Sequence, residues 1–70
     1  MRRLTKKHNG QTVTIVRDPV ICDGGVTEYG DPITGIYHHI ERGRYFEFEV
    51  DGLSGVCLFA RDEWSIVNVT

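Results

Sequence analysis

The sequence has 70 residues, 40% of them hydrophobic, and a formal net charge of −2. This length suffices for one small domain and excludes a second. No apolar run is long enough to span a membrane, and the basic N-terminus lacks the apolar segment of a secretory signal. We therefore expect a cytoplasmic protein. Two cysteines, Cys22 and Cys57, are too few for a disulfide scaffold, although a single pairing between them stays open.

Charge is distributed unevenly along the chain. Residues 18–70 contain all ten acidic residues and only three arginines, whereas residues 1–17 are basic and contain no acid. An acidic body repels nucleic-acid phosphates and attracts basic protein surfaces. The basic segment is either a nucleic-acid contact or a solubilising terminus.

Residues 1–9 show no apolar periodicity, and we expect a flexible basic arm that ends at the Asn9-Gly10 turn signal. Residues 11–17 (QTVTIVR) are rich in strand-forming residues and predict a first strand with Val13 and Ile15 facing inward. Residues 18–32 form a long Gly- and Asp-rich loop, compatible with a small irregular hairpin that projects from the sheet. A loop this long in a small domain is usually functional or mobile.

The second predicted strand covers residues 33–40 (ITGIYHHI) and is followed by a polar turn at 41–43. Because side chains alternate between the two faces of a strand, its residues divide into two sets. One face holds Ile36, His38 and Ile40, and the other holds Gly35, Tyr37 and His39. We expect Tyr37 to lie on the outer face, beside the hairpin that follows.

The stretch from Arg44 to Trp64 organises the domain. Strict alternation from Tyr45 to Val50 indicates a strand with one buried face. Asp51-Gly52 suits a two-residue type I′ turn, which would pair Val50 with Leu53. Phe48 would then pair with Gly55, and Phe46 with Cys57. The predicted inner face holds Phe46, Phe48, Val50, Leu53, Cys57 and Phe59, and the outer face Tyr45, Glu47, Glu49, Ser54, Val56 and Leu58.

The residues after Phe59 are too few for a stable helix. We expect Asp62 to cap a single helical turn, with Trp64 folding back onto the sheet. Residues 66–69 predict a short last strand, which is exposed to pairing with another copy if nothing covers it.

These elements resemble an SH3-like small barrel over residues 10–70, which implies an all-β, five-stranded fold with a long first loop and a single helical turn before the last strand. The motifs on which this resemblance rests are Gly10-x-x-Val13-x-Ile15, Thr34-Gly35-Ile36, Tyr45-Phe46-x-Phe48 and Phe59-x-x-Asp62-Glu63-Trp64. Such barrels serve as peptide-binding modules, nucleic-acid-binding domains and accessory subunits, so the architecture does not select the function. Tyr29 is the only aromatic residue of the first loop, and the closing segment Asp62-Glu63-Trp64-Ser65 departs from the peptide-binding pattern; both features argue against recognition of proline-rich peptides. An OB-like barrel is the alternative, but the chain is short for it and lacks its helix.

No motif predicts catalysis, a metal or a cofactor. His38 and His39 are strand neighbours that point to opposite faces, and with Cys22 and Cys57 they lack the ligand spacing of a zinc site. The acids of the first loop lack the spacing of an EF-hand. The sequence shows no base that could activate Cys57 as a nucleophile. Paired carboxylates on an exposed strand, such as Glu47 and Glu49, are usually solvated. A chain this short is not expected to enclose a pocket. We therefore expect no enzyme.

The sequence favours a non-enzymatic protein-interaction module, such as a small bacterial or phage accessory or inhibitor protein that docks on a larger machine. An acidic loop and an outer aromatic patch would contact a basic partner surface. The predicted contact residues are Asp23, Glu28, Tyr29, Asp31, Tyr37, Tyr45, Glu47, Val56, Leu58 and Trp64. The outer residues are equally compatible with a second small core, closed by the long loop or by Trp64.

Nucleic-acid binding is the alternative function. The basic arm would provide Arg2, Arg3, Lys6 and Lys7, and Tyr37 and Tyr45 would stack on bases. We expect the protein to be a monomer, or a weak homo-oligomer formed through its edge strand.

Overall fold

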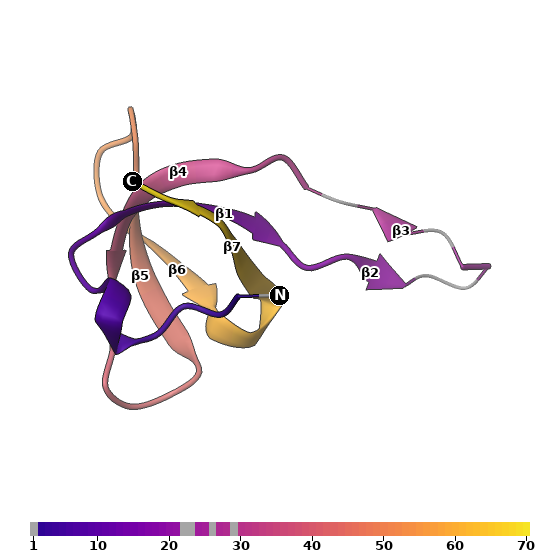
Figure 1. Ribbon diagram of the computed structural model, residues 1–70, viewed down its shortest axis with the longest axis horizontal. Coiled ribbons are helices and arrows are strands. Elements are labelled where there is room, and N and C mark those ends of the chain that lie inside the picture. Colours follow the sequence, from indigo (N-terminus) through magenta and orange to yellow (C-terminus); the bar gives the residue numbers. More distant parts are fainter. Residues whose placement is uncertain (1, 22–23, 26, 29) are drawn as a thin grey trace.

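The computed structural model describes residues 2–21, 24–25, 27–28 and 30–70 (Figure 1). Within this part the strands are β1 (Thr12–Arg17), β2 (Val20–Ile21), β3 (Thr27–Glu28), β4 (Ile33–His38), β5 (Tyr45–Val50), β6 (Cys57–Ala60) and β7 (Trp64–Val69). Two short 3-10 turns, η1 (Lys6–His8) and η2 (Arg61–Glu63), complete the fold. The chain is therefore all-β, as predicted.

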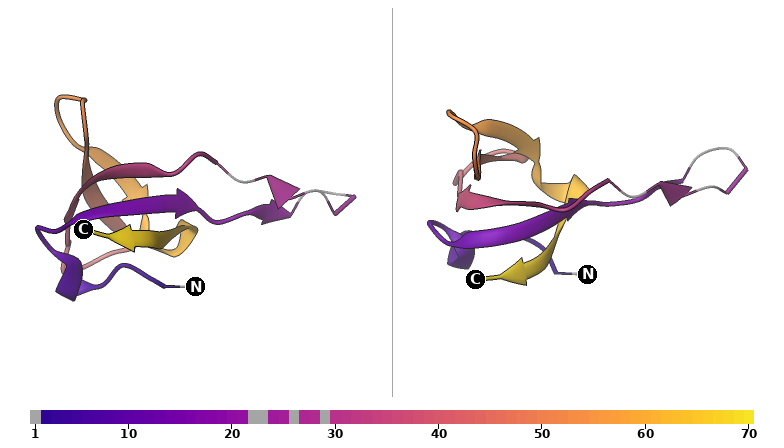
Figure 2. Two further views of the ribbon diagram at one scale, coloured as in Figure 1. Left: turned by 45° about the horizontal axis from the view of Figure 1, so that its top comes forward. Right: turned by 90° about the horizontal axis from the view of Figure 1, so that it is seen from above.

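Five strands form one antiparallel sheet in the order β6-β5-β4-β1-β7. The first and last members of this order, β6 and β7, are its two edges, so the sheet is not closed by hydrogen bonds. The sheet bends around its inner face, and β2 and β3 form a separate ribbon that extends away from it (Figure 2). The long loop at 18–32 therefore contains the small projecting hairpin with which its sequence is compatible.

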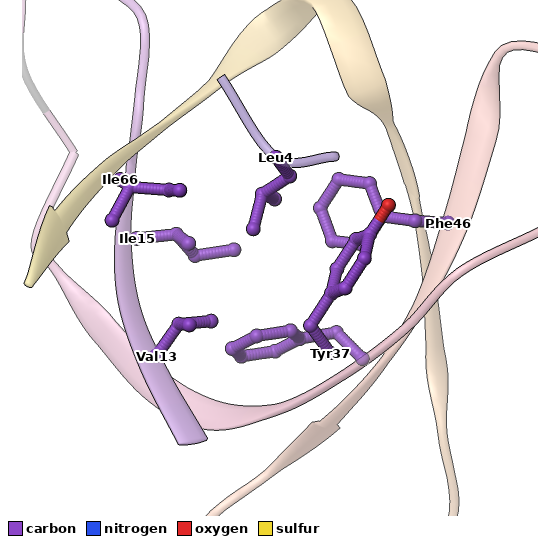
Figure 3. Close-up of a cluster of buried hydrophobic side chains, with 7 residues drawn as sticks. Leu4, Val13, Ile15, Tyr37, Phe46 and Ile66 are labelled. Atoms are coloured by element: carbon purple, nitrogen blue, oxygen red, sulfur yellow. The ribbon is translucent and has the colours of Figure 1, made fainter. Parts of the chain in front are cut away.

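The inner face of the bent sheet encloses a single hydrophobic core (Figure 3). Val13 and Ile15 are fully buried, which confirms the predicted inward face of the first strand. Burial of each such side chain contributes about 1.5–3 kcal/mol relative to exposure. The buried members of the core are Leu4, Val13, Ile15, Tyr37, Phe46, Phe48 and Ile66.

The predicted outer position of Tyr37 is wrong. Tyr37 lies opposite Phe48 across the β4–β5 pair, and residues opposite one another project to the same face. Both side chains are fully buried. The Tyr37 hydroxyl shares a 2.9 Å hydrogen bond with Nδ1 of His39. Burying the phenol ring removes more apolar surface from water than burying His38 would, and His38 instead keeps a polar partner on the outer face.

The register of the β5–β6 hairpin also differs from the prediction. Phe46 lies opposite Phe59 and Phe48 opposite Cys57, a displacement of two residues along β6. The amide of Leu53 still donates to the Val50 carbonyl at 3.1 Å, so Asp51-Gly52 does form a turn. However, only Gly52 has positive φ there, which excludes type I′. Leu53 is therefore 65% exposed in the connecting loop rather than on the inner face, where Phe46 and Phe48 are buried as predicted and Val50, Cys57 and Phe59 are half-buried.

The chain reaches its last strand earlier than predicted. The 3-10 turn η2 lies between β6 and β7, but its N-cap residue is Ala60, so Asp62 lies within the turn rather than capping it. Trp64 begins β7 and pairs with Arg17. The Trp64 ring packs on Phe59 with ring centroids 4.5 Å apart, so it does fold back onto the sheet.

The N-terminal segment packs against the sheet. Ile66 of β7 donates its amide to the Arg2 carbonyl at 2.9 Å, and the two residues form an isolated β-bridge. Leu4 is only 2% exposed and belongs to the core. The turn η1 follows, and Asn9 Oδ1 accepts a 2.9 Å hydrogen bond from the His39 amide. The segment that the sequence predicts to be a flexible basic arm therefore contributes Leu4 to the core and covers part of the β7 edge.

Candidate functional site

Exposed apolar side chains gather on the β5–β6 hairpin. Tyr45, Leu53, Val56 and Leu58 are each more than half exposed, and Val67 on β7 is the fifth such residue in the described part of the chain. Tyr45 and Leu58 project to the outer face, opposite the buried Phe46, and Val56 directly precedes β6. Tyr45, Glu47, Val56 and Leu58 are called the β6 surface below. Because these apolar side chains are exposed, the alternative of a second small core closed over them is wrong.

Carboxylates lie on the β6 surface and beside it. Glu47 lies opposite Leu58 on one side and opposite His38 on the other. Glu49 follows on the same face of β5, and its Oε2 accepts a hydrogen bond from His38 Nε2 at 2.7 Å. Asp51 is exposed at the turn that follows. Apolar side chains beside negatively charged carboxylates fit a partner protein whose surface is basic and partly apolar.

The backbone of β6 is open on one side. Within the described residues β6 pairs only with β5, because it is the last strand of the sheet. The Arg61 amide donates to the Arg44 carbonyl at 2.6 Å. Hydrogen-bonded and non-bonded pairs alternate along an antiparallel ladder, so the backbone groups of Leu58 point away from β5. An extended segment laid along this edge would find unpaired backbone groups beside the exposed Leu58 side chain.

The structure separates the two predicted parts of the contact. Asp23 and Tyr29 lie outside the described residues, as does Cys22. Glu28 belongs to β3, and Asp31 is exposed where the chain returns to β4. The β2–β3 ribbon extends away from β5 and β6 in every view (Figures 1 and 2). The described part of this ribbon and the β6 surface therefore do not form one continuous site.

Two further predicted contact residues belong to the interior. Tyr37 is in the core, where burial raises the pKa of its phenol although the nearby Arg61 charge acts in the opposite direction. Trp64 is half-buried against Phe59. Of the ten predicted contact residues, the structure thus brings together the four that make up the β6 surface.

The basic N-terminal residues are partly neutralised. Arg3 Nη1 lies 2.6 Å from Asp18 Oδ2, and Lys6 Nζ lies 3.1 Å from Glu41 Oε1. Partial desolvation raises the pKa of Asp18, but hydrogen bonds from Ser65 and Arg3 outweigh it and leave that pKa below its usual value. The hydrogen bond and charge of Lys6 lower the pKa of Glu41. With Tyr37 buried as well, the nucleic-acid hypothesis keeps the exposed Arg2, Lys7 and Tyr45 but loses one stacking platform.

A second feature was not predicted from the sequence. An open pocket of about 560 Å³ lies where the N-terminal segment meets the start of β5 and the turn η2, and it is lined by Arg3, Arg44, Arg61 and Asp62. Arg61 Nη2 donates to the carbonyls of Ile40 at 2.8 Å and Tyr45 at 3.4 Å. The one available signal was that Arg44 and Arg61 belong to the only three arginines of an otherwise acidic body.

Among the described residues, no three His, Cys, Asp or Glu side chains come close enough together to hold a metal ion. Cys57 is half-buried and unpaired by any cysteine in that part of the chain. No helix there has the length and apolar character needed to cross a membrane. A scan against protein-family models finds no match, and comparisons with curated proteins and with solved structures find none either.

Proposed function

We propose that the protein is a non-enzymatic interaction module that binds an extended, basic segment of another protein along β6. The observation that carries this proposal is the open β6 edge, which lies beside the exposed Leu58 and Val56 side chains. Addition of a strand would satisfy the free backbone groups and cover apolar surface at the same time. The carboxylates of Glu47 and Glu49 on the same face favour lysine or arginine at alternate positions of the incoming strand.

We also propose that the bent sheet is an SH3-like small barrel. Two observations support this architecture. The last strand, β7, returns to pair with β1, while β4, β5 and β6 follow in sequence order. A 3-10 turn directly precedes the last strand, at the position where the sequence motif Phe59-x-x-Asp62-Glu63-Trp64 resembles that family.

Charge complementarity favours a basic partner over a second copy of this chain. Two β6 edges paired about a twofold axis would place the Glu47 and Glu49 carboxylates of both copies on the same face of one sheet, next to its shared edge strands. Like charges on one face of an interface oppose association, whereas opposite charges accelerate it at low salt. Self-association through β6 is therefore the competing outcome that an experiment has to exclude.

The test compares two matched lysine substitutions. Leu58→Lys places a like charge where a basic partner would bind, and Val67→Lys makes the same change at a comparably exposed position on β7. Host-cell lysate treated with nuclease is passed over the wild-type protein and both variants, and captured proteins are quantified. We expect a discrete protein to be captured by wild type and Val67→Lys and to be lost with Leu58→Lys. Equal capture by all three proteins would contradict the β6 assignment.

Charge reversal locates the acidic contribution. Glu47→Lys changes the β6 surface, and Asp31→Lys changes the exposed return from the ribbon. Loss of the captured protein with Glu47→Lys alone supports the β6 surface, whereas loss with Asp31→Lys alone would move the contact to the ribbon. Light scattering over a range of concentrations shows whether the free protein is a monomer, as the proposal requires.

A further inference from the structure

Three arginines that are distant in sequence converge on the pocket described above. Arg3 lies in the N-terminal segment, Arg44 directly precedes β5, and Arg61 begins η2. The hydrogen bond between the Arg61 amide and the Arg44 carbonyl, 2.6 Å long, fixes the backbones of these two residues together. Arg3 is held in place by Asp18 Oδ2 at 2.6 Å and by the Trp64 carbonyl at 3.0 Å. These contacts therefore fix the positions from which the three arginine side chains reach the pocket.

The positive charge of this pocket is only partly balanced by the protein. Asp18 pairs with Arg3, but no carboxylate of the described residues forms an ion pair with Arg44 or Arg61. Asp62 lines the same pocket without pairing with any of the three arginines in that part of the chain. Arg44 and Arg61 thus have no ion-pair partner among the described residues, and with Asp62 in the lining the pocket keeps a net positive charge in a chain whose formal net charge is −2.

The protein itself holds the Arg61 side chain in place. Its Nη2 atom donates to the carbonyls of Ile40 at 2.8 Å and Tyr45 at 3.4 Å, and its Nε atom is buried. A guanidinium group that is already ordered loses little side-chain freedom when it binds a ligand. An oxygen atom of an anion in the pocket would balance the charge of this group.

We propose that the pocket between Arg3, Arg44 and Arg61 binds a small organic anion through its phosphoryl or carboxylate group. The planar guanidinium group presents donors in a fork that matches the oxygens of either acid. The volume of about 560 Å³ is that of a small-molecule site rather than of a single ion, so the acid group is attached to an organic body. The Asp62 carboxylate, which can only accept hydrogen bonds when ionised, selects a body that carries hydroxyl donors.

Nuclear magnetic resonance titration tests this site directly, because the Nε–H groups of arginine give their own signals. The probes are glycerol 3-phosphate and glycerate, two hydroxyl-bearing compounds that differ in the acid group, each added at constant ionic strength against sodium chloride. Arg44→Gln removes one pocket cation, and Arg42→Gln removes a cation at an exposed position two residues away that does not line the pocket.

We expect saturable shifts of the Arg61 and Arg44 signals with at least one probe, which Arg44→Gln weakens by about tenfold and Arg42→Gln by less than about twofold. Saturation with glycerol 3-phosphate alone identifies a phosphoryl ligand, with glycerate alone a carboxylate ligand, and with both a site for either acid. Shifts that do not saturate by about 10 mM, or that both variants weaken equally, would overturn the proposal. An unchanged amide spectrum of free Arg44→Gln establishes that the variant is folded.

Discussion

Gly35 is the position at which a single methyl group is expected to unfold the protein. It lies in β4 opposite Val50 of β5 and is buried. A Cβ atom built on Gly35 would lie 2.0 Å from the Glu49 carbonyl oxygen and 2.8 Å from Cε2 of Phe48. The nearest of these atoms belongs to the backbone and cannot turn away. Gly35→Ala therefore requires β4 and β5 to separate.

The size of this effect follows from the contact. An ordinary Cβ contact begins at 3.4 Å, so the Glu49 carbonyl would have to move by more than 1 Å. Such a movement breaks about two neighbouring hydrogen bonds of the ladder from Gly35–Val50 to His38–Glu47, each contributing about 1 kcal/mol. Displacement of the packed Phe48 ring adds about 1–3 kcal/mol. The sum is on the order of 4 kcal/mol, which equals the roughly 3–5 kcal/mol that a core of this size supplies in total.

Urea unfolding measures the effect, with the fluorescence of the single tryptophan, Trp64, as the signal and far-ultraviolet circular dichroism as a second probe. Gly30→Ala is the matched control, since Gly30 does not need positive φ and a Cβ there would lie 3.9 Å from its nearest neighbour, Arg17 Cβ. We expect Gly35→Ala to be largely unfolded without urea and Gly30→Ala to stay within about 0.5 kcal/mol of wild type. A folded Gly35→Ala variant within about 1 kcal/mol of wild type would refute the close approach of β5 to β4 at Gly35.

Three other predictions test the core and its titrating groups. Leu4→Ala should lower the free energy of unfolding by about 2–4 kcal/mol, and Leu53→Ala, at an exposed position, by less than about 0.5 kcal/mol; similar melting temperatures for both variants would place the N-terminal segment outside the core. Burial raises the pKa of Tyr37 in the folded state. The stabilising effect of the buried, neutral phenol is therefore complete below the unfolded pKa near 10 and is lost as pH rises through the folded pKa. Between about pH 8 and 12 the urea midpoint should fall less in Tyr37→Phe than in wild type. Desolvation raises the pKa of Asp18, but hydrogen bonds from Ser65 and Arg3 leave that pKa lowered. The contribution of Asp18 to stability is therefore present above the unfolded pKa near 3.9 and is lost as pH falls through the folded pKa. Asp18→Asn should show a flatter acid unfolding profile than wild type, and an unchanged profile would exclude the Ser65 and Arg3 contacts.

Local patterns predicted the strands whose two faces differ clearly. In β1, Val13 and Ile15 alternate with threonines, and in β5 the phenylalanines alternate with Tyr45 and glutamates, so a period of two identifies both the strand and its buried face. In β4 both faces carry large side chains, and periodicity alone could not choose between Ile36 and Tyr37. The signal that could have decided was Gly35, because a glycine inside a strand marks the close approach of another backbone.

The other differences arise from contacts that local patterns do not contain. The Asp51-Gly52 signal located the turn, but Leu53 to Val56 extend the loop, and a displacement of two residues keeps every side chain of β6 on its predicted face. Leu4 is a lone apolar residue in a basic segment, and only the space left beside Ile66 and Phe46 makes it a core residue (Figure 3). The arginine pocket depends on three separate segments, so no spacing in the sequence could predict it.

The two edge strands of the sheet, β6 and β7, differ in how far other parts of the chain cover them, and this difference bears on function. Natural proteins protect edge strands by covering them or by placing lysine or proline on them. At β7 the chain covers part of its own edge, since the Arg2 carbonyl accepts a hydrogen bond from the Ile66 amide. The β6 residues Cys57 to Ala60 contain neither lysine nor proline, and the exposed Leu58 lies opposite an acid. An uncovered apolar edge beside carboxylates favours pairing with a basic strand. The same carboxylates repel those of a second copy, so the residues that attract the proposed partner also oppose self-association.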